Sequence, residues 1–144
     1  MSITFNDRLR QLRGSKCTGV DAVEYEERPA DTIYAVGTVL GFEDGTRLSA
    51  QFWRLIKDRK PLVSIFDHRQ KYGLPEPVDA IGMLEREVKG KAVVSAELDL
   101  VTGDLRFGYE GELTLEVFNF TGFEIWDMRF SDGTMELSNY VLQG

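Results

Sequence analysis

Few residues of this chain have side chains suited to acid–base or nucleophilic chemistry. The one histidine, His68, stands in Asp67-His68-Arg69, and the one cysteine, Cys17, follows Lys16. A catalytic histidine needs a nucleophile within hydrogen-bond reach, and no Gly-x-Ser-x-Gly motif presents a serine to it. We expect His68 to be a surface or loop-anchoring residue and Cys17 to be a small buried apolar residue. The sequence therefore predicts that the protein is not an enzyme, and a reaction that uses His68 is kept as the third alternative.

The sequence also predicts no metal and no cofactor. One histidine and one cysteine cannot supply a zinc site of the usual ligand spacing, and the Asp-x-Asp pattern of a calcium loop is absent. Gly103, Gly108 and Gly111 are spread through hairpin-like segments, so they do not form the glycine-rich turn that binds a dinucleotide between a strand and a helix.

The charge of the chain is unevenly distributed. The 144 residues carry a net charge of −7. Residues 1–74 hold 12 Lys and Arg against 10 Asp and Glu, and residues 75–144 hold 5 against 14. An acidic half repels phosphate backbones and attracts a basic partner. Basic residues between 54 and 71 lie near aromatic ones, but Asp58 and Asp67 interrupt them, so we expect no nucleic-acid partner.

Compartment is inferred from segments that the sequence lacks. No apolar run approaches the ~18 residues that cross a membrane, and the first residues do not have the pattern of a signal peptide. A single cysteine cannot form an internal disulfide. We therefore expect a cytoplasmic protein with no membrane partner.

Similar sequence features recur in the two halves in the same order. Each half has a glycine that ends a helix-like stretch, then a turn, then a tryptophan. The paired features are Leu12-Arg13-Gly14 with Val88-Lys89-Gly90, Phe42-Glu43-Asp44-Gly45-Thr46 with Tyr109-Glu110-Gly111-Glu112, and Trp53 with Trp126. Their offsets of roughly 65 to 75 residues suit a duplicated α+β module and exceed the periods of solenoid repeats.

Helix and strand signals fit the same division. One helix is expected to begin at Asn6 and end at Gly14, and another to begin at Pro77 and end at Gly90. Apolar alternation and turn residues predict the strands Thr18–Tyr25, Ile33–Phe42, Thr46–Ile56, Leu62–Phe66, Ala92–Leu100, Leu105–Tyr109, Leu113–Phe120, Phe123–Phe130 and Met135–Leu142.

These elements predict an α+β fold with an internally duplicated module. Each copy is a short helix followed by an antiparallel β-meander of four to five strands. Residues 1–74 form the first α+β copy and residues 75–144 the second, and the two pack as one compact unit. The sequence leaves open whether the strands form two sheets or one.

Three segments, residues 48–55, 66–75 and 117–126, together resemble small acidic bacterial immunity proteins of polymorphic toxin and contact-dependent growth-inhibition systems. The resemblance covers most of the chain in pattern and carries no catalytic signature. It implies an immunity protein that binds a cognate toxin domain, a basic nuclease, and occludes the active site of that toxin through an acidic face.

Two sets of residues are the candidate sites. The hypothetical partner-binding set is Glu110, Glu112, Glu116, Glu124, Asp127, Glu136, Phe118 and Tyr140. The alternative function is a small-ligand or partner-binding module, with a pocket formed by Trp53, His68 and Tyr72. The identity of the toxin and the oligomeric state are left open.

Overall fold

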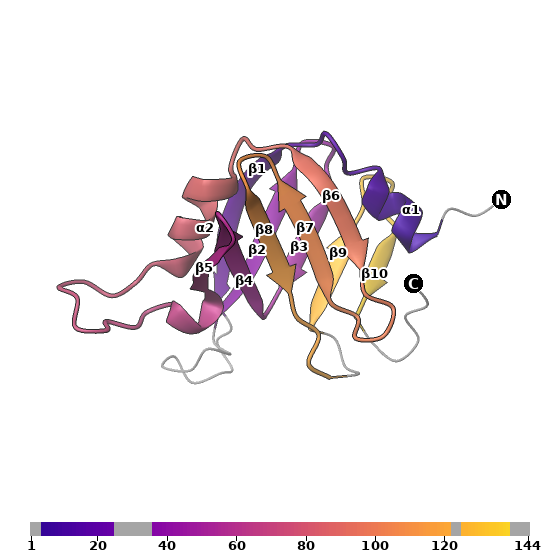
Figure 1. Ribbon diagram of the computed structural model, residues 1–144. Helices are drawn as coiled ribbons and strands as arrows, with labels where there is room; N and C mark the ends of the chain where they lie inside the picture. The colour runs from indigo at the N-terminus through magenta and orange to yellow at the C-terminus, as the bar shows by residue number, and fades with distance from the viewer. Residues whose placement is uncertain (1–3, 25–35, 122–124, 139–144) are drawn as a thin grey trace.

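The computed structural model describes residues 4–24, 36–121 and 125–138 (Figure 1). Ten strands, two α-helices and a short 3₁₀ helix form within this part of the chain. Their bounds are α1 Phe5–Arg10, β1 Cys17–Glu24, β2 Val36–Phe42, β3 Arg47–Ala50, β4 Trp53–Lys57, β5 Lys60–Ser64, η2 Ile65–Asp67, α2 Ala80–Val88, β6 Val93–Leu98, β7 Leu105–Tyr109, β8 Leu113–Val117, β9 Trp126–Arg129 and β10 Met135–Leu137.

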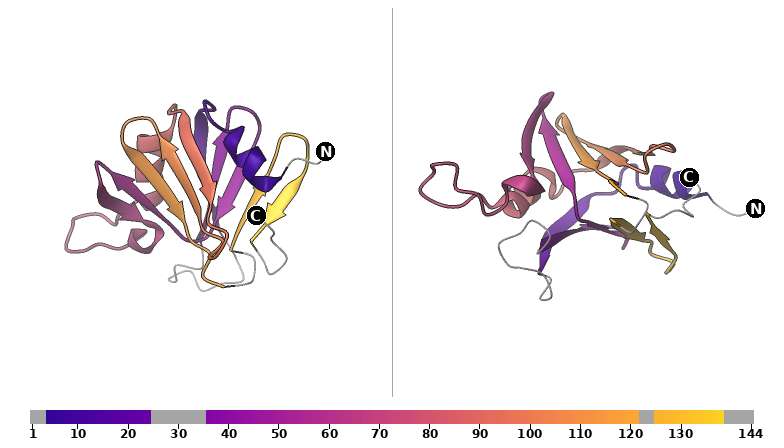
Figure 2. Two further views of the ribbon diagram at one scale, coloured as in Figure 1. Left: turned by 45° about the vertical axis from the view of Figure 1, so that its right-hand side comes forward. Right: turned by 90° about the horizontal axis from the view of Figure 1, so that it is seen from below.

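The strands form two antiparallel sheets of five strands each. The front sheet of Figure 1 has the order β5-β4-β8-β7-β6, and the back sheet has the order β1-β2-β3-β9-β10. In β8, Leu113, Leu115 and Val117 are buried while Thr114 and Glu116 are half-buried on the other face. This period of two turns the apolar side of each sheet inward, and the inner faces of the two layers together form the core. Figure 2 shows the two layers in further views.

The two helices close opposite sides of this sandwich (Figure 1). α2 contacts β1 of the back sheet and β5 of the front sheet, whereas α1 contacts β6 of the front sheet. Phe5 of α1 stacks on Trp126 of the back sheet at 5.6 Å between ring centroids, so α1 also reaches β9. Leu9 and Leu84 put the buried face of each helix into the common core. Neither helix of the described chain is long and apolar enough to cross a membrane.

The helices begin at other residues than the sequence indicated. Thr4 caps α1, because its side chain accepts from the N–H of Asp7 while the Asp7 carboxylate accepts from Thr4. Asn6 therefore lies inside the helix. Asp79 caps α2 through a 3.0 Å bond from the N–H of Gly82, and Pro77 precedes the helix. In each case a side-chain oxygen accepts from an unpaired N–H of the first turn, the hydroxyl of Thr4 in α1 and the carboxylate of Asp79 in α2, and this fixes where the helix begins.

The α+β class and the antiparallel pairing agree with the sequence, but neither half forms a meander of its own. Each half gives its first three strands to one sheet and its last two to the other, so β4 pairs with β8 and β9 pairs with β3. The predicted strand Thr46–Ile56 is broken at residues 51 and 52, where the chain passes from the back sheet to the front sheet. Between β8 and β9 the chain crosses in the opposite direction.

Matched hydrogen bonds join the halves at the end where the helices lead into the first strands. The N–H of Gly14 donates to the carbonyl of Val93 at 2.8 Å, and the N–H of Gly90 donates to the carbonyl of Cys17 at 2.8 Å. Both glycines have positive φ, of 88° and 80°, which a residue with a Cβ adopts only with strain. The two segments that leave the helices are thereby tied to each other across the sandwich.

Candidate functional site

The predicted acidic set is spread over different parts of the surface. Glu110 and Glu112 lie in the β7–β8 turn, and Glu116 lies about 13 Å farther along β8 on the outer face of the front sheet. Asp127 lies on the outer face of the back sheet, because its neighbours in β9 are buried. Glu136 pairs with the buried Met128 and so faces the inner side of the back sheet at its edge. These carboxylates do not form one acidic face.

The remaining members of that set divide in the same way. Phe118 directly follows β8 and lies next to Glu116 on the front sheet. Glu124 and Tyr140 lie outside the described residues. The structure therefore brings together Glu116 and Phe118, and their neighbourhood is the part of the prediction that a partner could use.

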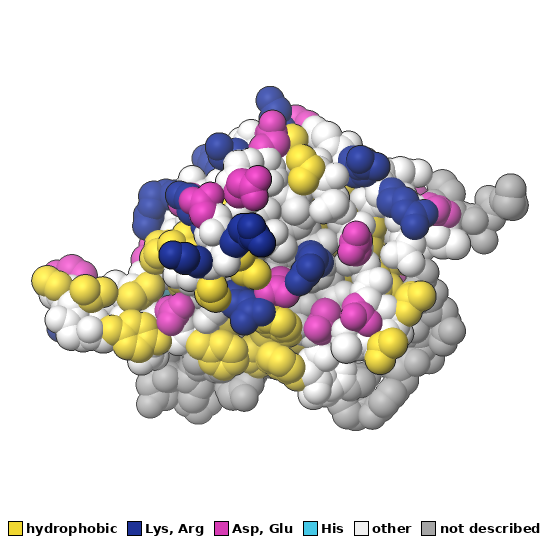
Figure 3. Space-filling view, in the orientation of Figure 1, with side chains coloured by type: hydrophobic (Ala, Val, Ile, Leu, Met, Phe, Trp, Pro, Cys, Tyr) yellow, Lys and Arg dark blue, Asp and Glu magenta, His cyan; other side chains and the backbone are white. Residues whose placement is uncertain are grey.

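Three phenylalanines, two of them exposed and one half-buried, form a cluster at the end of the front sheet, which we call the aromatic patch: Phe66, Phe120 and the half-buried Phe118. Phe66 is 47% exposed and Phe120 is 59% exposed. Phe118 stacks on Phe120 at 5.6 Å, and the buried Phe52 lies beneath, 5.9 Å from Phe66 and 5.1 Å from Phe120. Hydrophobic side chains gather at the lower part of this face in Figure 3. Exposed aromatic groups held in contact with one another are typical of a protein-binding surface.

An ion-pair network borders the aromatic patch. The carboxylate of Glu116 accepts from Arg54 at 2.5 Å and from Arg106 at 3.0 Å, and its side chain is 14% exposed. Burial raises the pKa of Glu116, but the hydrogen bonds from Arg54 and Arg106 outweigh it, so its pKa lies below the ordinary value. The guanidinium of Arg54 also lies over the ring of Phe118 at 5.3 Å. Glu116 thus orients a cation against the patch and carries little free negative charge.

A hollow of about 320 Å³ adjoins the patch, and we call it the acidic hollow. It is lined by four carboxylate residues and one arginine together with three apolar residues. The lining residues are Glu97, Leu98, Asp99, Asp104, Leu105, Arg106, Glu116 and Phe118. Since Phe118 lines the hollow and also belongs to the patch, the two features form one continuous site on the front sheet.

Local hydrogen bonds hold two of these carboxylates in place. The carboxylate of Asp99 accepts from the N–H of Thr102 at 3.1 Å and of Val101 at 2.8 Å, and these bonds lower the pKa of Asp99. The carboxylate of Asp104 accepts from the N–H of Asn119 at 2.7 Å, and the amide of Asn119 donates to the carbonyl of Thr102 at 3.0 Å. Asn119 stands between two patch phenylalanines, so it ties the hollow to the patch.

The alternative pocket does not gather its three residues in one accessible place. Trp53 is 1% exposed, and its indole Nε1 donates to Thr38 inside the core at 2.9 Å, so it offers a ligand no surface. Tyr72 is 66% exposed on the loop that projects from the body between η2 and α2 (Figure 1), and its hydroxyl donates to Asp67 at 2.9 Å. His68 is held at the base of that loop.

His68 and Cys17 have the environments of structural residues. The Nδ1 of His68 accepts from the N–H of Ala80 at 3.1 Å, and burial followed by the neighbouring charge of Arg69 lowers the pKa of His68. Cys17 is 2% exposed, and burial raises the pKa of its thiol, which disfavours the reactive thiolate. In the described ranges no group of three or more His, Cys, Asp and Glu side chains is placed to hold a metal ion.

Sequence reasoning missed most of the site because its parts come from distant segments. Phe66 follows β5, while Asp99 and Asp104 flank the β6–β7 turn. Only the strand order places β5, β4, β8, β7 and β6 side by side, and the sequence did not predict that order.

The site is thus a surface of aromatic side chains and fixed charges, with no nucleophile and base in contact among the described residues that line it. Comparison with known proteins adds no family or relative, since the chain matches no protein-family model, no curated protein and no solved structure.

Proposed function

We propose that this protein is an immunity protein that binds a cognate bacterial toxin domain in the cytoplasm of the producing cell and blocks its active site. The observation that carries the proposal is the continuous aromatic patch and acidic hollow on the front sheet. Aromatic and arginine side chains dominate the energy of protein interfaces, and here Arg54 is fixed against Phe118 by Glu116. A pre-ordered surface also loses little side-chain entropy on binding.

The charge of the surface favours a basic partner. The lining of the acidic hollow has four carboxylates against one guanidinium, and the whole chain has a net charge of −7. A nuclease grips phosphates with Lys and Arg, so the same cations fit a hollow lined by carboxylates. Opposite net charges also speed encounter. We therefore place the contact region at the acidic hollow beside Phe118 and not across the scattered acidic residues that the sequence suggested.

We also propose that the scaffold arose as an internally duplicated module whose last hairpins exchanged sheets. The support is the parallel between β1-β2-β3-β9-β10 and β6-β7-β8-β4-β5, in which equivalent strands stand in equivalent order. The reciprocal bonds of Gly14 and Gly90 obey the same relation. Such interlocked copies make a stiff two-layer support for a binding surface.

Neutralisation of a toxin tests the function directly. The chain is co-expressed with the toxin domain encoded by the neighbouring reading frame, and growth and complex formation are measured. We expect growth to be restored by the wild-type chain and lost with the double variant Phe118→Ser and Phe120→Ser, because interface anchors of this kind contribute about 2 kcal/mol or more each. The double variant must retain the circular dichroism spectrum of the wild type. Phe120 is exposed whereas Phe118 is half-buried against the core, so the single variant Phe120→Ser is measured as well and should weaken neutralisation.

Matched charge reversals test the position of the contact. Glu97→Lys changes the exposed rim of the acidic hollow, while Glu112→Lys makes the same change in the β7–β8 turn. We expect the first to slow association at low salt and the second to leave the rate unchanged. If only Glu112→Lys slows association, the contact lies at that turn and the proposed site is wrong. If the wild-type chain neither binds nor neutralises the toxin, the immunity function is wrong.

A further inference from the structure

The edge of β1 shows how this fold satisfies an outward-facing strand N–H. Val20 lies opposite Leu40 in the β1–β2 pair, and its N–H donates away from β2 to the carboxylate of Glu85 at 2.9 Å. Glu85 belongs to α2, which packs along this edge. A helix carboxylate therefore occupies the groove between α2 and β1 and accepts from the free edge of the sheet.

Ala96 holds the corresponding place at the edge of β6. β1 and β6 each contain a register shift at the start, between Cys17 and Gly19 in one and between Val93 and Ser95 in the other. Ala96 is the first residue after Ser95, as Val20 is the first after Gly19. It lies opposite Phe107, as Val20 lies opposite Leu40.

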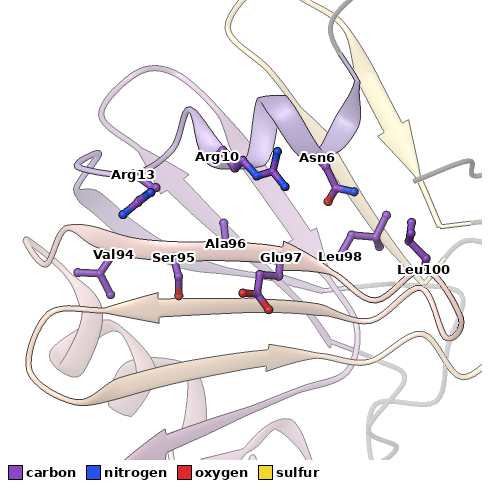
Figure 4. A pocket seen from close by; sticks show the side chains of 9 residues that line it. All are labelled: Asn6, Arg10, Arg13, Val94, Ser95, Ala96, Glu97, Leu98 and Leu100. Carbon is purple, nitrogen blue, oxygen red and sulfur yellow. The ribbon is translucent and has the colours of Figure 1, made fainter.

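No carboxylate of the described chain accepts from Ala96. The N–H of Asp99 donates to Asp104 across the β6–β7 hairpin at 2.9 Å. Since bonding direction alternates along an antiparallel strand, Glu97 points its N–H and carbonyl toward β7 while Ala96 and Leu98 point theirs outward. A groove of about 450 Å³ lies at this edge between β6 and α1 (Figure 4). Its lining residues are Asn6, Arg10, Arg13, Val94, Ser95, Ala96, Glu97, Leu98 and Leu100.

Two arginines give this groove a positive wall. Figure 4 shows Arg10 and Arg13 on the α1 side of β6, whereas the carboxylate of Glu97 extends to the other side of the strand. Arg10 meets Asp7 only at 3.5 Å with 71% of its side chain exposed, and Arg13 makes no ion pair with a described residue. The groove at β1 contains the carboxylate of Glu85. The groove at β6 contains the guanidinium groups of Arg10 and Arg13, which suit a carboxylate from another molecule.

We propose that the groove between α1 and β6 binds an extended acidic segment of a partner protein. The segment lies along the edge of β6, its Asp or Glu carboxylate accepts from the N–H of Ala96, and Arg10 and Arg13 balance the charge. This is the arrangement that Glu85 makes within the chain at β1, transferred to a second molecule. Edge-strand addition supplies backbone bonds, and the arginines select an acidic residue.

A pair of blocked pentapeptides tests this site, with the sequences Thr-Val-Glu-Val-Thr and Thr-Val-Gln-Val-Thr. Each is titrated into the ¹⁵N-labelled full chain while amide signals are recorded. We expect the Glu peptide to shift the amide signals of Ala96 and Leu98 to saturation and the Gln peptide to bind about tenfold more weakly, since a charged hydrogen-bonded pair contributes about 1.4 kcal/mol or more.

Variants of the chain locate the effect. Arg13→Gln should lower the affinity for the Glu peptide several-fold. Arg10→Glu should abolish its binding, because it places a tethered carboxylate in the groove. Arg47→Gln is the matched control, since it removes an exposed arginine from the back sheet and should leave the affinity unchanged. The double variant Phe118→Ser and Phe120→Ser should also bind the peptide normally, so this test stands apart from toxin neutralisation.

Equal affinity for the two peptides, shifts centred away from β6, or no shift at millimolar peptide would each overturn the proposal. Sodium acetate is the remaining arm. If acetate alone shifts the Ala96 signal with the affinity of the Glu peptide, the groove takes small carboxylates and the segment proposal is wrong. If acetate binds much more weakly, the backbone of the extended segment contributes as proposed.

Discussion

Trp53 and Trp126 occupy corresponding places in the two sheets. Trp53 lies opposite Val117 across the β4–β8 pair, and Trp126 lies opposite Ala50 across the β9–β3 pair. Both indoles are 1% exposed. Each tryptophan begins the strand that the chain enters after crossing between sheets, so each anchors in the core the hairpin that follows the crossing.

The Trp53–Thr38 hydrogen bond should couple β4 energetically to β2. Its length is 2.9 Å, and both residues are buried. We expect Trp53→Phe and Thr38→Val each to lower the free energy of unfolding by about 1–3 kcal/mol, because each leaves a buried polar partner unpaired. The loss of unfolding free energy in the double variant should be about 1 kcal/mol smaller than the sum of the losses in the two single variants. Urea denaturation measures all three values.

Trp126 supplies the control for that cycle. Its Nε1 donates to the carbonyl of Gly103 at 2.8 Å, so it makes no hydrogen bond to Thr38, although both residues lie opposite Ala50 in the back sheet. Trp126→Phe and Thr38→Val should therefore show a smaller coupling energy than Trp53→Phe and Thr38→Val. A similar coupling in both pairs would contradict a specific bond between Trp53 and Thr38.

The division of each half between the two sheets predicts that neither half folds alone. A fragment of residues 1–74 would present β4 and β5 without the β8 neighbour that completes their sheet. We expect circular dichroism to show each fragment, 1–74 and 75–144, largely unfolded, and the equimolar mixture to regain the β-sheet signal. Independent folding of either fragment would contradict the interlocked arrangement. The full chain is the reference for the recovered signal.

His68 should make stability depend on pH near neutrality. Burial and then Arg69 lower its pKa below 6.5 in the folded chain, so folding disfavours its protonated form. Stability is therefore full above pH 6.5 and falls as the pH drops through 6.5 toward the lowered folded value. His68 is the only histidine, so His68→Gln should flatten the profile between pH 7 and pH 5.5. Urea midpoints measure the profile, and a histidine proton titration gives the folded pKa.

Glu116 should contribute to stability at neutral pH and not in acid. Its pKa is lowered in the folded chain because the bonds from Arg54 and Arg106 outweigh the effect of burial. The contribution is present above the unfolded value and is lost as the pH falls through the folded value. Glu116→Gln should cost about 1 kcal/mol at pH 7, and the difference from wild type should shrink below pH 4.

A variant of an exposed carboxylate is the control that distinguishes the loss of this network from acid unfolding in general. Asp21 is exposed on β1 and makes no ion pair with a described residue. Asp21→Asn should therefore follow the wild-type profile from pH 7 to pH 3. If Glu116→Gln behaves like Asp21→Asn, the arginine network does not stabilise the fold.

Local sequence patterns predicted the secondary-structure elements well. They did not predict which strands that are distant in the sequence pair with each other. Alternation in Leu113–Val117 gave the buried and outward faces of β8 as observed. The run Thr46–Ile56 contains no glycine or proline at its crossing point, so nothing in its composition marks the change of sheet at Gln51 and Phe52. The crossing is fixed by partners far along the chain, where Gln51 donates to Ile125 at 3.1 Å and Phe118 donates to Phe52 at 2.9 Å.

The candidate site was predictable only where one strand supplied it. Glu116 and Phe118 lie two residues apart, so strand parity puts them on one face. The count of charged residues, by contrast, overestimated how many carboxylates of the second half are available to a partner. Glu85, Asp99 and Asp132 accept hydrogen bonds from the chain itself, and such carboxylates brace loops and edges before they can meet a partner.

The order of the strands also sets when this protein can fold during synthesis. β4 and β5 leave the ribosome long before β8, which alone lies between β4 and the rest of the front sheet. β3 likewise waits for β9. The nascent chain therefore exposes two unfinished sheet edges until β8 and β9 have been synthesised, and unpaired edges of this kind favour aggregation before folding is complete.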